Sequence, residues 1–401
     1  MQNILAVFIG GGIGAVLRYM TGVFALRFLS VNLPLATFAV NITGCFILGI
    51  LYALFIDKPE INTTLKLALT AGFCGGLTTF STFSLELFEM INNSQFINFS
   101  VYLLLSIIAG LAAVWIGVNL LKSFKFDKLN FLTAGMPLST GKGSYPRAFE
   151  ILNEMNLDGM ELEFVHGVRM SDETRSFVNK TVKEKNLILT AHAPFYVNLN
   201  AKEEEKVEAS ASRVFETAVA ARDTGAFSIT FHAAYYLGLE KDFVYNQVKT
   251  QISRILDRME KENFKVWIRP ETTGKATQWG DLEEIINLSK EFEYVLPCID
   301  FSHLHARSAG DFNTYDEFSY ILDEIGTKLG GYALENFHGH LAGIEYTAKG
   351  ERQHLNLEES DMNYVDLLKV LKEFNVKGAL VCESPNIEED ALLLKQTFAS
   401  L

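Results

Sequence analysis

Charged residues are almost absent from the first 124 of the chain's 401 residues. Nine charged side chains lie in that part, five basic and four acidic, for a net charge of +1. The remaining residues hold 30 basic and 44 acidic side chains, a net charge of −14, and all eight histidines. Two parts so different in charge suit different solvents, so the sequence excludes a single soluble domain.

Cysteine is also scarce, and no two cysteines form a CxxC pair. Cys45, Cys74, Cys298 and Cys382 all lie in apolar stretches. This pattern excludes a disulfide framework and fits a reducing compartment. A cleavable signal peptide is not predicted either, because the first apolar run lacks a basic segment before it and is one of four such runs.

The first part instead contains long apolar runs. A helix needs roughly 20 apolar residues to cross the hydrocarbon of a bilayer. Core helices of a soluble protein, the alternative interpretation, would be shorter and have amphipathic partners. We therefore predict an all-α domain of four transmembrane helices over residues 1–124, with spans at about 3–27, 33–55, 65–90 and 98–121.

Polar residues interrupt these apolar runs. Helices that only anchor a protein in lipid would not need such residues. Arg18 lies inside the first run and Asn41 inside the second, and polar groups are costly there unless they face protein or water. The third run contains Gly75 and Gly76, followed by five hydroxyl residues up to Ser84. A broken helix is tolerated only where it is buried or lines an aqueous path. Freed carbonyls could hold a cation, and the hydroxyls with Asn41 could replace water around a small anion.

Three motifs in order resemble the Fluc/CrcB fluoride channels: Gly11-x-x-Gly14-Ala-x-x-Arg18-Tyr19, Asn41-x-x-Gly44 and Gly75-Gly-Leu-Thr-Thr-Phe-Ser-Thr-Phe83. The resemblance implies a multi-pass protein of the cell membrane that exports fluoride passively. It also implies a dimer of antiparallel subunits with two pores. The pore residues that it implies are Asn41, Phe80, Phe83, Ser81 and Thr82, with Arg18 in the vestibule. Gly75 and Thr78 would then belong to the broken segment whose carbonyls bind a structural sodium ion.

Lysines in the loops predict the orientation in the membrane. With the N-terminus in the cytoplasm, the cytoplasmic segments hold five lysines, whereas the outside loops hold little beyond Arg27, and positive charge favours the cytoplasmic side. The second part of the chain is then cytoplasmic. An antiparallel dimer would need either an inverted homologue or a second copy inserted the other way. The five lysines are Lys58, Lys66, Lys122, Lys125 and Lys128.

After a short basic connector at 125–130, short apolar runs rich in β-formers alternate with longer amphipathic segments. Eight such repeats over residues 131–401 predict a (β/α)₈ barrel, with a doubly wound open sheet as the alternative. The expected strands lie at about 131–134, 160–164, 187–191, 227–231, 265–269, 295–299, 333–338 and 378–382.

A histidine or a carboxylate follows six of these strands. Barrels of this type hold their active sites at the carboxyl ends of the strands, so these side chains should converge. Imidazole and carboxylate together suit zinc, manganese or iron, and the number of ligands indicates more than one ion. The predicted ligands are His192, His232, Glu271, Asp300 with His303, His340 and Glu383.

The same part resembles endonuclease IV and related xylose-isomerase-like barrels. The matching motifs are Ala191-His192-Ala-Pro, Phe231-His232, Pro270-Glu271-Thr-Thr-Gly274, Ile299-Asp300-x-x-His303, His340-Leu-x-Gly343 and Cys382-Glu383-Ser-Pro385. The resemblance implies a zinc-dependent enzyme that cleaves DNA at abasic sites, with Glu271, Asp300 and Glu383 as catalytic residues. It assigns His192, His232 and Glu271 to one ion. Glu271 would bridge to a second ion held by Asp300, His340 and Glu383, and His303 would belong to a third.

Two features depart from that family. Where the family has Asp-x-His, this chain has Glu351-Arg-Gln353-His354, so the third ion depends on a shift of one residue that would let His354 substitute. The acidic balance is also unusual for a DNA-binding surface. A sugar or sugar-phosphate isomerase and an inactive cytoplasmic cap therefore remain alternatives. Basic residues expected near the mouth are Arg169, Arg269, Lys275, Arg307, Lys349 and Arg352.

Overall fold

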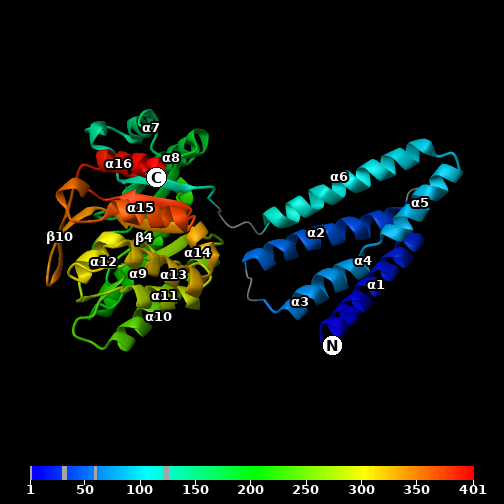
Figure 1. Ribbon diagram of the computed structural model, residues 1–401, viewed down its shortest axis with the longest axis horizontal. Helices are drawn as coiled ribbons and strands as arrows, with labels where there is room; N and C mark the ends of the chain where they lie inside the picture. The colour runs from blue at the N-terminus through cyan, green and yellow to red at the C-terminus, as the bar shows by residue number, and fades with distance from the viewer. Residues whose placement is uncertain (1, 29–33, 58–60, 121–125) are drawn as a thin grey trace. The chain divides into compact units, whose positions relative to one another are not determined.

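The structure, a computed structural model, describes residues 2–28, 34–57, 61–120 and 126–401 (Figure 1). It divides into two compact units, Met1–Ser123 and Phe124–Leu401. Part of the predicted connector and three of the lysines used to predict the orientation, Lys58, Lys122 and Lys125, lie outside the described residues. Each unit is described by itself.

The regular secondary structure described in the first unit is entirely helical. Within them, three helices are long and apolar enough to cross a membrane: α1 (Gln2–Phe28), α2 (Leu35–Asp57) and α6 (Phe96–Leu120). The run at 65–90, predicted as a fourth span that contains a break, is not confirmed as a transmembrane helix, and the break is present. That run is divided into α3 (Thr63–Leu67), the π-helix η1 (Ala68–Cys74), α4 (Gly75–Leu77) and α5 (Phe80–Asn92).

The interruption lies at Thr78 and Thr79, whose backbones are extended at ψ 158° and 117°. The helix resumes because the Thr79 side chain accepts a hydrogen bond from the backbone N–H of Thr82, which caps α5. A π-helical turn followed by an extended pair is a costly local structure and is frequent at functional sites. The glycines and hydroxyl residues of this run therefore produce a break, as their composition predicts.

Glycines let the helices of this unit pack backbone to backbone. A Cβ added to Gly14 would lie 2.3 Å from the carbonyl oxygen of Phe73, and one added to Gly76 would lie 2.3 Å from that of Gly11. Gly49 and Gly117 bring α2 and α6 together in the same way, at 2.4 and 2.3 Å from facing carbonyls. Close approach through small residues is the usual packing of helices in lipid.

The second unit is built on an eight-stranded parallel sheet with the order β6-β4-β3-β2-β1-β12-β9-β8. Parallel bridges from Ile268 to Val295 and from Glu271 to Cys298 join β6 to the segment before β8, which links the two ends of that order. The strands are β1 (Leu129–Ala134), β2 (Gly159–Glu163), β3 (Ile188–His192), β4 (Ser228–Phe231), β6 (Trp267–Pro270), β8 (Ile299–Asp300), β9 (Phe337–Leu341) and β12 (Gly378–Cys382).

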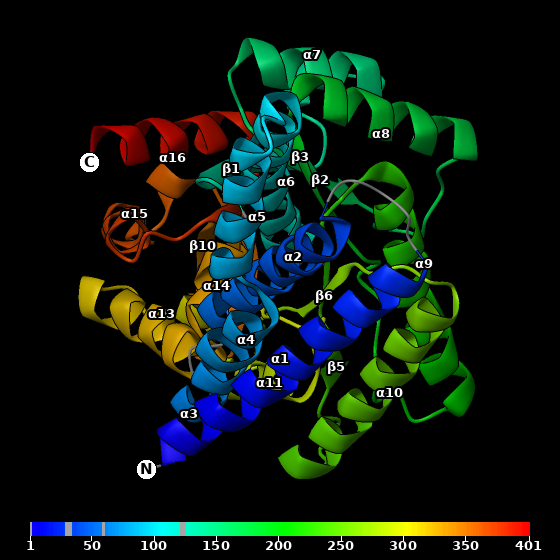
Figure 2. The same ribbon diagram turned by 90° about the vertical axis from the view of Figure 1, so that its right-hand side faces the viewer.

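Helices encircle these strands, as Figure 2 shows, in the arrangement of a TIM barrel. A large cluster of buried apolar side chains packs between the sheet and the helices. The helices are α7 (Tyr145–Glu154), α8 (Asp172–Lys185), α9 (Glu204–Thr224), α10 (Lys241–Lys261), α11 (Leu282–Glu291), α12 (Phe301–Arg307), α13 (Tyr315–Leu329), α14 (Gly331–Glu335), α15 (Tyr364–Glu373) and α16 (Glu388–Ser400), with 3₁₀ turns η2 (Leu138–Thr140) and η3 (Leu357–Glu359).

Two short antiparallel pairs extend from the loops after the strands. One joins β5 (Ala234–Tyr235) to β7 (Gln278–Trp279), and the other joins β10 (Gly343–Thr347) to β11 (Gly350–Leu355). The seventh barrel strand begins later than predicted, because residues 331–335 form helix α14. This later start places both His338 and His340 within β9.

Candidate functional site

The predicted ligands of the barrel lie at the carboxyl ends of its strands. His192 ends β3 and Asp300 ends β8, His340 lies near the end of β9, and three others follow the last residue of β4, β6 and β12. Because parallel strands expose these ends on one side of the barrel, the side chains converge at its mouth. The structure brings together all seven residues that the sequence predicts as ligands, in three adjoining groups.

The first group contains His192, His232 and Glu271, whose ligand atoms lie within 4.8 Å of one another. His192 Nε2 is 3.2 Å from Glu271 Oε2, and His232 Nε2 is 3.2 Å from Glu271 Oε1. Each imidazole thus meets a different oxygen of one buried carboxylate. Two imidazoles and a carboxylate form a ligand set that zinc favours.

The second group contains Glu271, Asp300, His340 and Glu383. His340 Nδ1 is 3.1 Å from Glu383 Oε1 and 3.6 Å from Glu271 Oε1. Glu271 therefore belongs to both groups. Three carboxylates and an imidazole can hold a second divalent ion beside the first.

A third group contains Asp300, His303 and His354. Glu351 Oε2 lies 3.6 Å from His303 Nε2, whereas Gln353 turns away and donates to Glu345 at 2.9 Å. A β-bulge explains this arrangement, because Tyr346 pairs with Glu351 and Glu345 with Gln353, which leaves no residue of β10 opposite Arg352. The extra residue reverses the alternation of the strand, so Glu351 and His354 reach the same face.

Three of these imidazoles are oriented by backbone carbonyls. His192, His303 and His354 each place Nδ1 near a carbonyl oxygen, that of Ala193 at 2.7 Å, Thr272 at 3.0 Å and Glu383 at 3.2 Å. Donation from Nδ1 leaves a lone pair on Nε2, which is the arrangement of metal-ligating histidines. His340 differs, because its Nδ1 faces the carboxylates and its Nε2 faces the barrel interior.

Buried polar atoms without hydrogen bonds show that these residues fit metal ions. Among the described residues, Asp300 Oδ2, His340 Nδ1 and His354 Nε2 are buried and form no hydrogen bond, although carboxylates and imidazoles lie close by. Buried polar groups are otherwise almost always hydrogen-bonded. Ligand atoms around a common metal ion typically lie within about 3 to 4 Å of one another but form no hydrogen bonds among themselves, because their lone pairs point to the ion.

The same contacts shift the pKa values of the ligands. Burial opposes the charged forms, but His340 outweighs it and lowers the pKa of Glu383 to about 2. Burial also disfavours protonated His192, but the bond to Glu271 and the charge of Glu163 raise its pKa to about 10. In Asp300, burial dominates and raises the pKa to about 6.

Metal binding should therefore release protons and weaken in acid. His192 is protonated at neutral pH in the metal-free protein because its pKa is raised, and it must lose that proton to become a ligand. For each proton released on binding, the affinity for the metal ion changes by up to about tenfold per pH unit. Proton release detected by an indicator dye in weak buffer, with zinc titrations between about pH 6 and 8, would measure this. Constant affinity over that range would contradict it.

The sequence predicted no role for Glu161 and Glu163 of β2 and left His338 without an assigned one. Glu161 and His338 are fully buried below the metal groups, whereas Glu163 ends β2 with an exposed side chain. The sequence feature that could have identified the two glutamates is their spacing: they lie two residues apart in an apolar strand, and alternate residues of a barrel strand face inward. Of the six basic residues expected near the mouth, Arg269 and Arg307 are engaged within the fold. Arg269 is buried against Asn336, and Arg307 holds the loop at 273–278.

Two further histidines that the sequence left without a ligand role lie apart from the ligands. His305 is buried in α12 and lies 3.2 Å from Asp361, a structural contact. His166 is exposed after β2 and packs edge-on against Phe195, with ring centroids 5.8 Å apart. Phe195 follows ligand His192 by three residues and has 63% of its surface exposed. This aromatic pair lies beside the mouth of the barrel.

In the first unit, the predicted ion-path residues gather at the break before α5. Asn41 and Thr79 exchange two hydrogen bonds, with Asn41 Nδ2 donating to the Thr79 carbonyl at 3.2 Å and the Thr79 N–H donating to Asn41 Oδ1 at 2.8 Å. Arg18 donates to the carbonyl of Thr78 at 2.7 Å. The side chains from two helices thus satisfy backbone groups that the break leaves free.

The phenylalanines and hydroxyl groups begin α5 directly after this break. Phe80 is 80% exposed and Phe83 only 9% exposed, with their ring centroids 6.1 Å apart. Ser81 and Thr82 follow Phe80, and both hydroxyls approach that of Thr79, at 3.3 and 3.0 Å. Of the predicted sodium ligands, the Thr78 carbonyl is the one that Arg18 contacts, and Gly75 opens α4.

An acid in this unit with two specific partners was also missed by the sequence reasoning. Glu86 accepts hydrogen bonds from the hydroxyls of Thr37 at 2.6 Å and Tyr102 at 2.9 Å. Tyr102 in turn packs edge-on against Phe83, with centroids 5.1 Å apart. The sequence feature that could have identified it is its place within an apolar run, because an acidic residue in such a run usually has a specific partner. Glu86 is therefore connected to the predicted pore residue Phe83.

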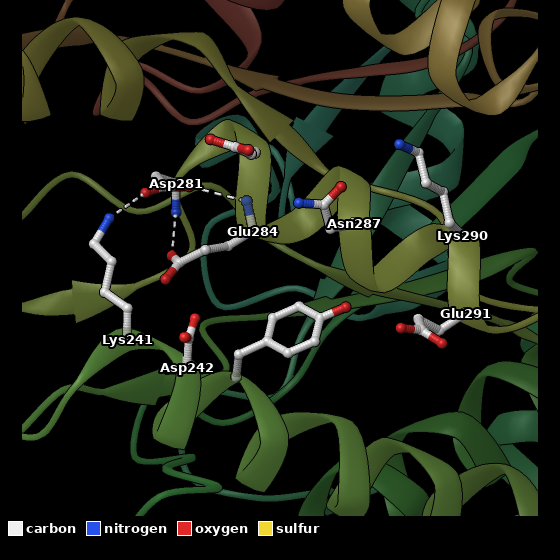
Figure 3. Close-up of a pocket in the computed structure, with 9 residues that line it drawn as sticks. Lys241, Asp242, Asp281, Glu284, Asn287, Lys290 and Glu291 are labelled. Carbon is white, nitrogen blue, oxygen red and sulfur yellow. Dashed lines mark hydrogen bonds and ion pairs between the residues drawn. The ribbon is translucent and has the colours of Figure 1, made fainter.

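A hollow of about 520 Å³ between α10 and α11 is unrelated to either site (Figure 3). Several of its polar groups are engaged in the fold. Lys241 pairs with Asp281 at 2.8 Å, and Asp281 and Glu284 form the capping box of α11. Lys249 pairs with Glu291 at 2.9 Å. These side chains stabilise helix ends and neighbouring helices.

Comparison with known proteins agrees with this division of the chain. Residues 149–401 match the family model described as xylose isomerase-like TIM barrel, and residues 5–118 match that of CrcB-like protein, camphor resistance. An uncharacterized protein of Methanocaldococcus jannaschii is 47% identical over 275 residues, which cover 68% of this chain and 98% of that protein. A fluoride-specific ion channel FluC of Phocaeicola vulgatus is 41% identical over 118 residues, 29% of this chain and 97% of that protein.

Solved structures resemble the barrel in fold. An endonuclease IV from Thermus thermophilus is 17% identical with a TM-score of 0.53, and the match covers 68% of this chain and 98% of that one. A D-tagatose 3-epimerase-like protein is 18% identical with a TM-score of 0.52, and the match covers 67% of this chain and 96% of that one. The chain belongs to the xylose isomerase-like TIM barrel family, and its N-terminal part belongs to the CrcB/FluC family.

Proposed function

We propose that this chain is a fluoride channel subunit joined to a metal-dependent phosphodiesterase that acts at abasic sites in DNA. Residues 1–124 would form the channel domain, residues 125–130 the connector and residues 131–401 the enzyme. The observation that supports the enzyme is the carboxylate of Glu271, which belongs to two adjoining groups of metal ligands. The observation that supports the channel is the interrupted helix at Thr78 and Thr79, with its polar partners Arg18 and Asn41.

In the channel domain, the segment from Thr63 to Asn92 would cross the membrane as a broken fourth span. Fluoride would pass the hydroxyls of Ser81 and Thr82, Asn41 and the ring edges of Phe80 and Phe83, which carry partial positive charge. Thr78 and Gly75 would contribute carbonyls to a structural sodium ion in an antiparallel dimer. The partner subunit would be a second copy or an inverted homologue, and the barrel would lie in the cytoplasm.

In the enzyme domain, His192, His232 and Glu271 would hold one zinc ion, and Glu271, Asp300, His340 and Glu383 a second. His303, His354 and Glu351 can hold a third. Metal ions held by these residues would supply a nucleophile at neutral pH and electrostatic stabilisation for a phosphoryl displacement. The chain's own residues fix this geometry, because Nδ1 of three ligand histidines is tied to backbone carbonyls.

Residues at the mouth can position a nucleic acid. Phe195 is exposed beside His192, and aromatic rings stack on bases regardless of sequence. Arg169 and Lys349 are exposed and available to phosphates, which compensates in part for the engaged Arg269 and Arg307. This combination favours DNA over a free sugar as the substrate.

A sugar or sugar-phosphate isomerase is the second candidate. The net charge of −14 and the loss of two expected basic residues at the mouth favour it, since they weaken binding to a polyanion. It would need neither the histidine pair His192 and His232 nor the exposed Phe195. The first group of ligands therefore distinguishes the two candidates.

The test is incision of a duplex with a single abasic site by the full chain in detergent at low salt. We expect cleavage beside the abasic site, none in the undamaged duplex, and loss with a strong chelator that zinc reverses. The matched assay is turnover of ketose sugars with the same preparation. Metal-loaded protein that isomerises a sugar and leaves the abasic duplex intact would overturn the nuclease in favour of the isomerase. No activity in either assay would favour the inactive cap.

A further inference from the structure

A carboxylate lies directly beneath the metal ligands, inside the barrel. Glu161 of β2 is 0% exposed, and its two oxygens face two different imidazoles of β9. Oε2 is 3.1 Å from His338 Nε2, and Oε1 is 3.1 Å from His340 Nε2. Within the described residues, neither oxygen has a well-aligned hydrogen-bond partner, and these two rings are its ion-pair contacts. The contacts are therefore close but not ideally directed.

The hydrogens of this cluster can be assigned by chemistry. An ionised carboxylate only accepts hydrogen bonds, so both facing Nε2 atoms must carry hydrogen. His338 Nδ1 then has a lone pair and accepts from the hydroxyl of Ser228, which is 3.0 Å away. His340 Nδ1 faces the carboxylates of Glu271 and Glu383, so it carries a second proton in the metal-free protein and presents a lone pair only when a metal ion displaces that proton. With the metal bound, one tautomer of each ring satisfies the whole cluster.

The cluster occupies a place that apolar side chains usually fill. Barrel interiors of this fold are packed mostly with branched apolar residues, and a buried carboxylate there carries a large desolvation penalty. Three other ligand histidines at the mouth have a backbone carbonyl to orient them, whereas both nitrogens of His340 face carboxylates. A carboxylate on the far nitrogen is the other common way of orienting a metal-ligating histidine.

We propose that Glu161 is a positioning residue that fixes the tautomer and ring orientation of His340, so that Nδ1 is its metal-binding atom, with His338 and Ser228 holding Glu161 in place. This inference rests on the proposed metal centre. It assigns the cluster no ion and no substrate of its own. Its effect on the reaction is indirect, through the affinity and geometry of the ion that His340 binds.

The decisive variant is Glu161→Gln in the full chain. An amide has the size of the carboxylate but offers one acceptor and one donor, so one of the two rings must change tautomer. We expect the affinity of the centre for zinc or cobalt to fall about 10- to 100-fold. The visible spectrum of bound cobalt should also change. Glu150→Gln, a substitution of an exposed acid on α7, serves as the control and should leave both readouts unchanged.

Histidine tautomers supply a readout that a loss of stability would not move. In zinc-loaded protein with ¹⁵N-labelled histidine, we expect His338 and His340 both to carry hydrogen on Nε2, with Nδ1 of His340 free of hydrogen. In the Glu161→Gln variant, one of these two signals should convert to the Nδ1–H form. His340 in the Nδ1–H form in the wild-type protein would overturn the proposal.

The outcomes separate this inference from the proposed function. Metal bound by the Glu161→Gln variant with wild-type affinity and spectrum would overturn the positioning role, even if the enzyme is active. Wild-type protein that binds no metal would remove the proposed metal centre and this inference with it. Cys298, His338 and His340 also have mutually close ligand atoms. Loss of one whole ion in both Glu161→Gln and Cys298→Ser would show that the cluster is itself a metal site, and would overturn the positioning role.

Discussion

Replacing Glu271 with glutamine should strip metal from the barrel and abolish incision while the chain still folds. Glu271 is 1% exposed and lies within 3.6 Å of four histidines, His192, His232, His303 and His340. A neutral amide removes the charge shared by two groups of ligands and turns an N–H₂ donor toward them. We expect metal affinity to fall by more than about 100-fold, the upper range for changes outside the ligand shell itself. Metal content after dialysis and incision rates would measure the effect.

A second buried glutamate of the same barrel supplies the control. Glu284 is 9% exposed and accepts hydrogen bonds from Tyr236 and from the backbone N–H groups of Gly280 and Asp281. Glu284→Gln should lower thermal stability through the loss of charge-assisted bonds, roughly 1 to 3 kcal/mol, but keep the full metal content. The two variants therefore separate loss of metal from loss of stability. Metal retained at wild-type stoichiometry in Glu271→Gln would rule out the bridging role.

Residues at strand ends were predictable because the fold itself brings them together. An apolar strand followed by His192, His232 or Glu383 places that side chain at the mouth of any parallel barrel, whatever the loops do. Closure of the barrel then decides which of these side chains lie next to one another. The pattern of strand ends therefore predicted the cluster of ligands, whereas the sharing of Glu271 between neighbouring groups was implied by the resemblance to endonuclease IV.

Residues whose position depends on local irregularity were not predictable in the same way. His354 joins His303 because a bulge at Arg352 reverses the alternation of β11, and nothing in the residue types of that hairpin specifies the bulge. Arg269 and Glu271 are two residues apart at the end of β6, yet Arg269 is bonded to Asn336 and Glu271 belongs to two groups of candidate metal ligands. The two side chains differ because Arg269 lies deeper inside the barrel than Glu271. How deep a residue lies depends on the register of the neighbouring strands, which the sequence does not give.

The interrupted helix shows the reverse case, in which the composition predicted the irregularity itself. Two glycines and five hydroxyl residues between apolar flanks indicated a break, and the break occurs at Thr78 and Thr79. The cap by Thr79 and the hydrogen bonds from Asn41 come from residues that the motifs contain. The π-helical turn before the break depends on packing against α1, where Gly10 and Gly14 admit its backbone.

Fluoride efflux from liposomes that contain the channel should disappear when Phe80 and Phe83 are both replaced by isoleucine. Isoleucine keeps the apolar character of the segment but lacks a ring edge with partial positive charge, which is the feature that an anion would meet. The two rings differ in what else they contact. Phe83 packs on Tyr102, whereas Phe80 is 80% exposed and meets only the ring of Phe83 among the described aromatic pairs. The single variant Phe80→Ile is therefore the cleaner test, since it disturbs little of the fold.

The matched control is Phe88→Ile on the same helix, where the side chain is 58% exposed. It removes an identical ring at a position that the resemblance does not place in the pore, so flux should persist. A fluoride electrode would follow efflux from liposomes loaded with fluoride, and gel filtration would confirm that each variant assembles as the wild type does. Efflux from Phe80→Ile at the wild-type rate would remove Phe80 from the pore. Equal loss in Phe80→Ile and Phe88→Ile would point instead to a general requirement for aromatic packing in α5, and would leave the ion path to Asn41 and the hydroxyl groups at the break.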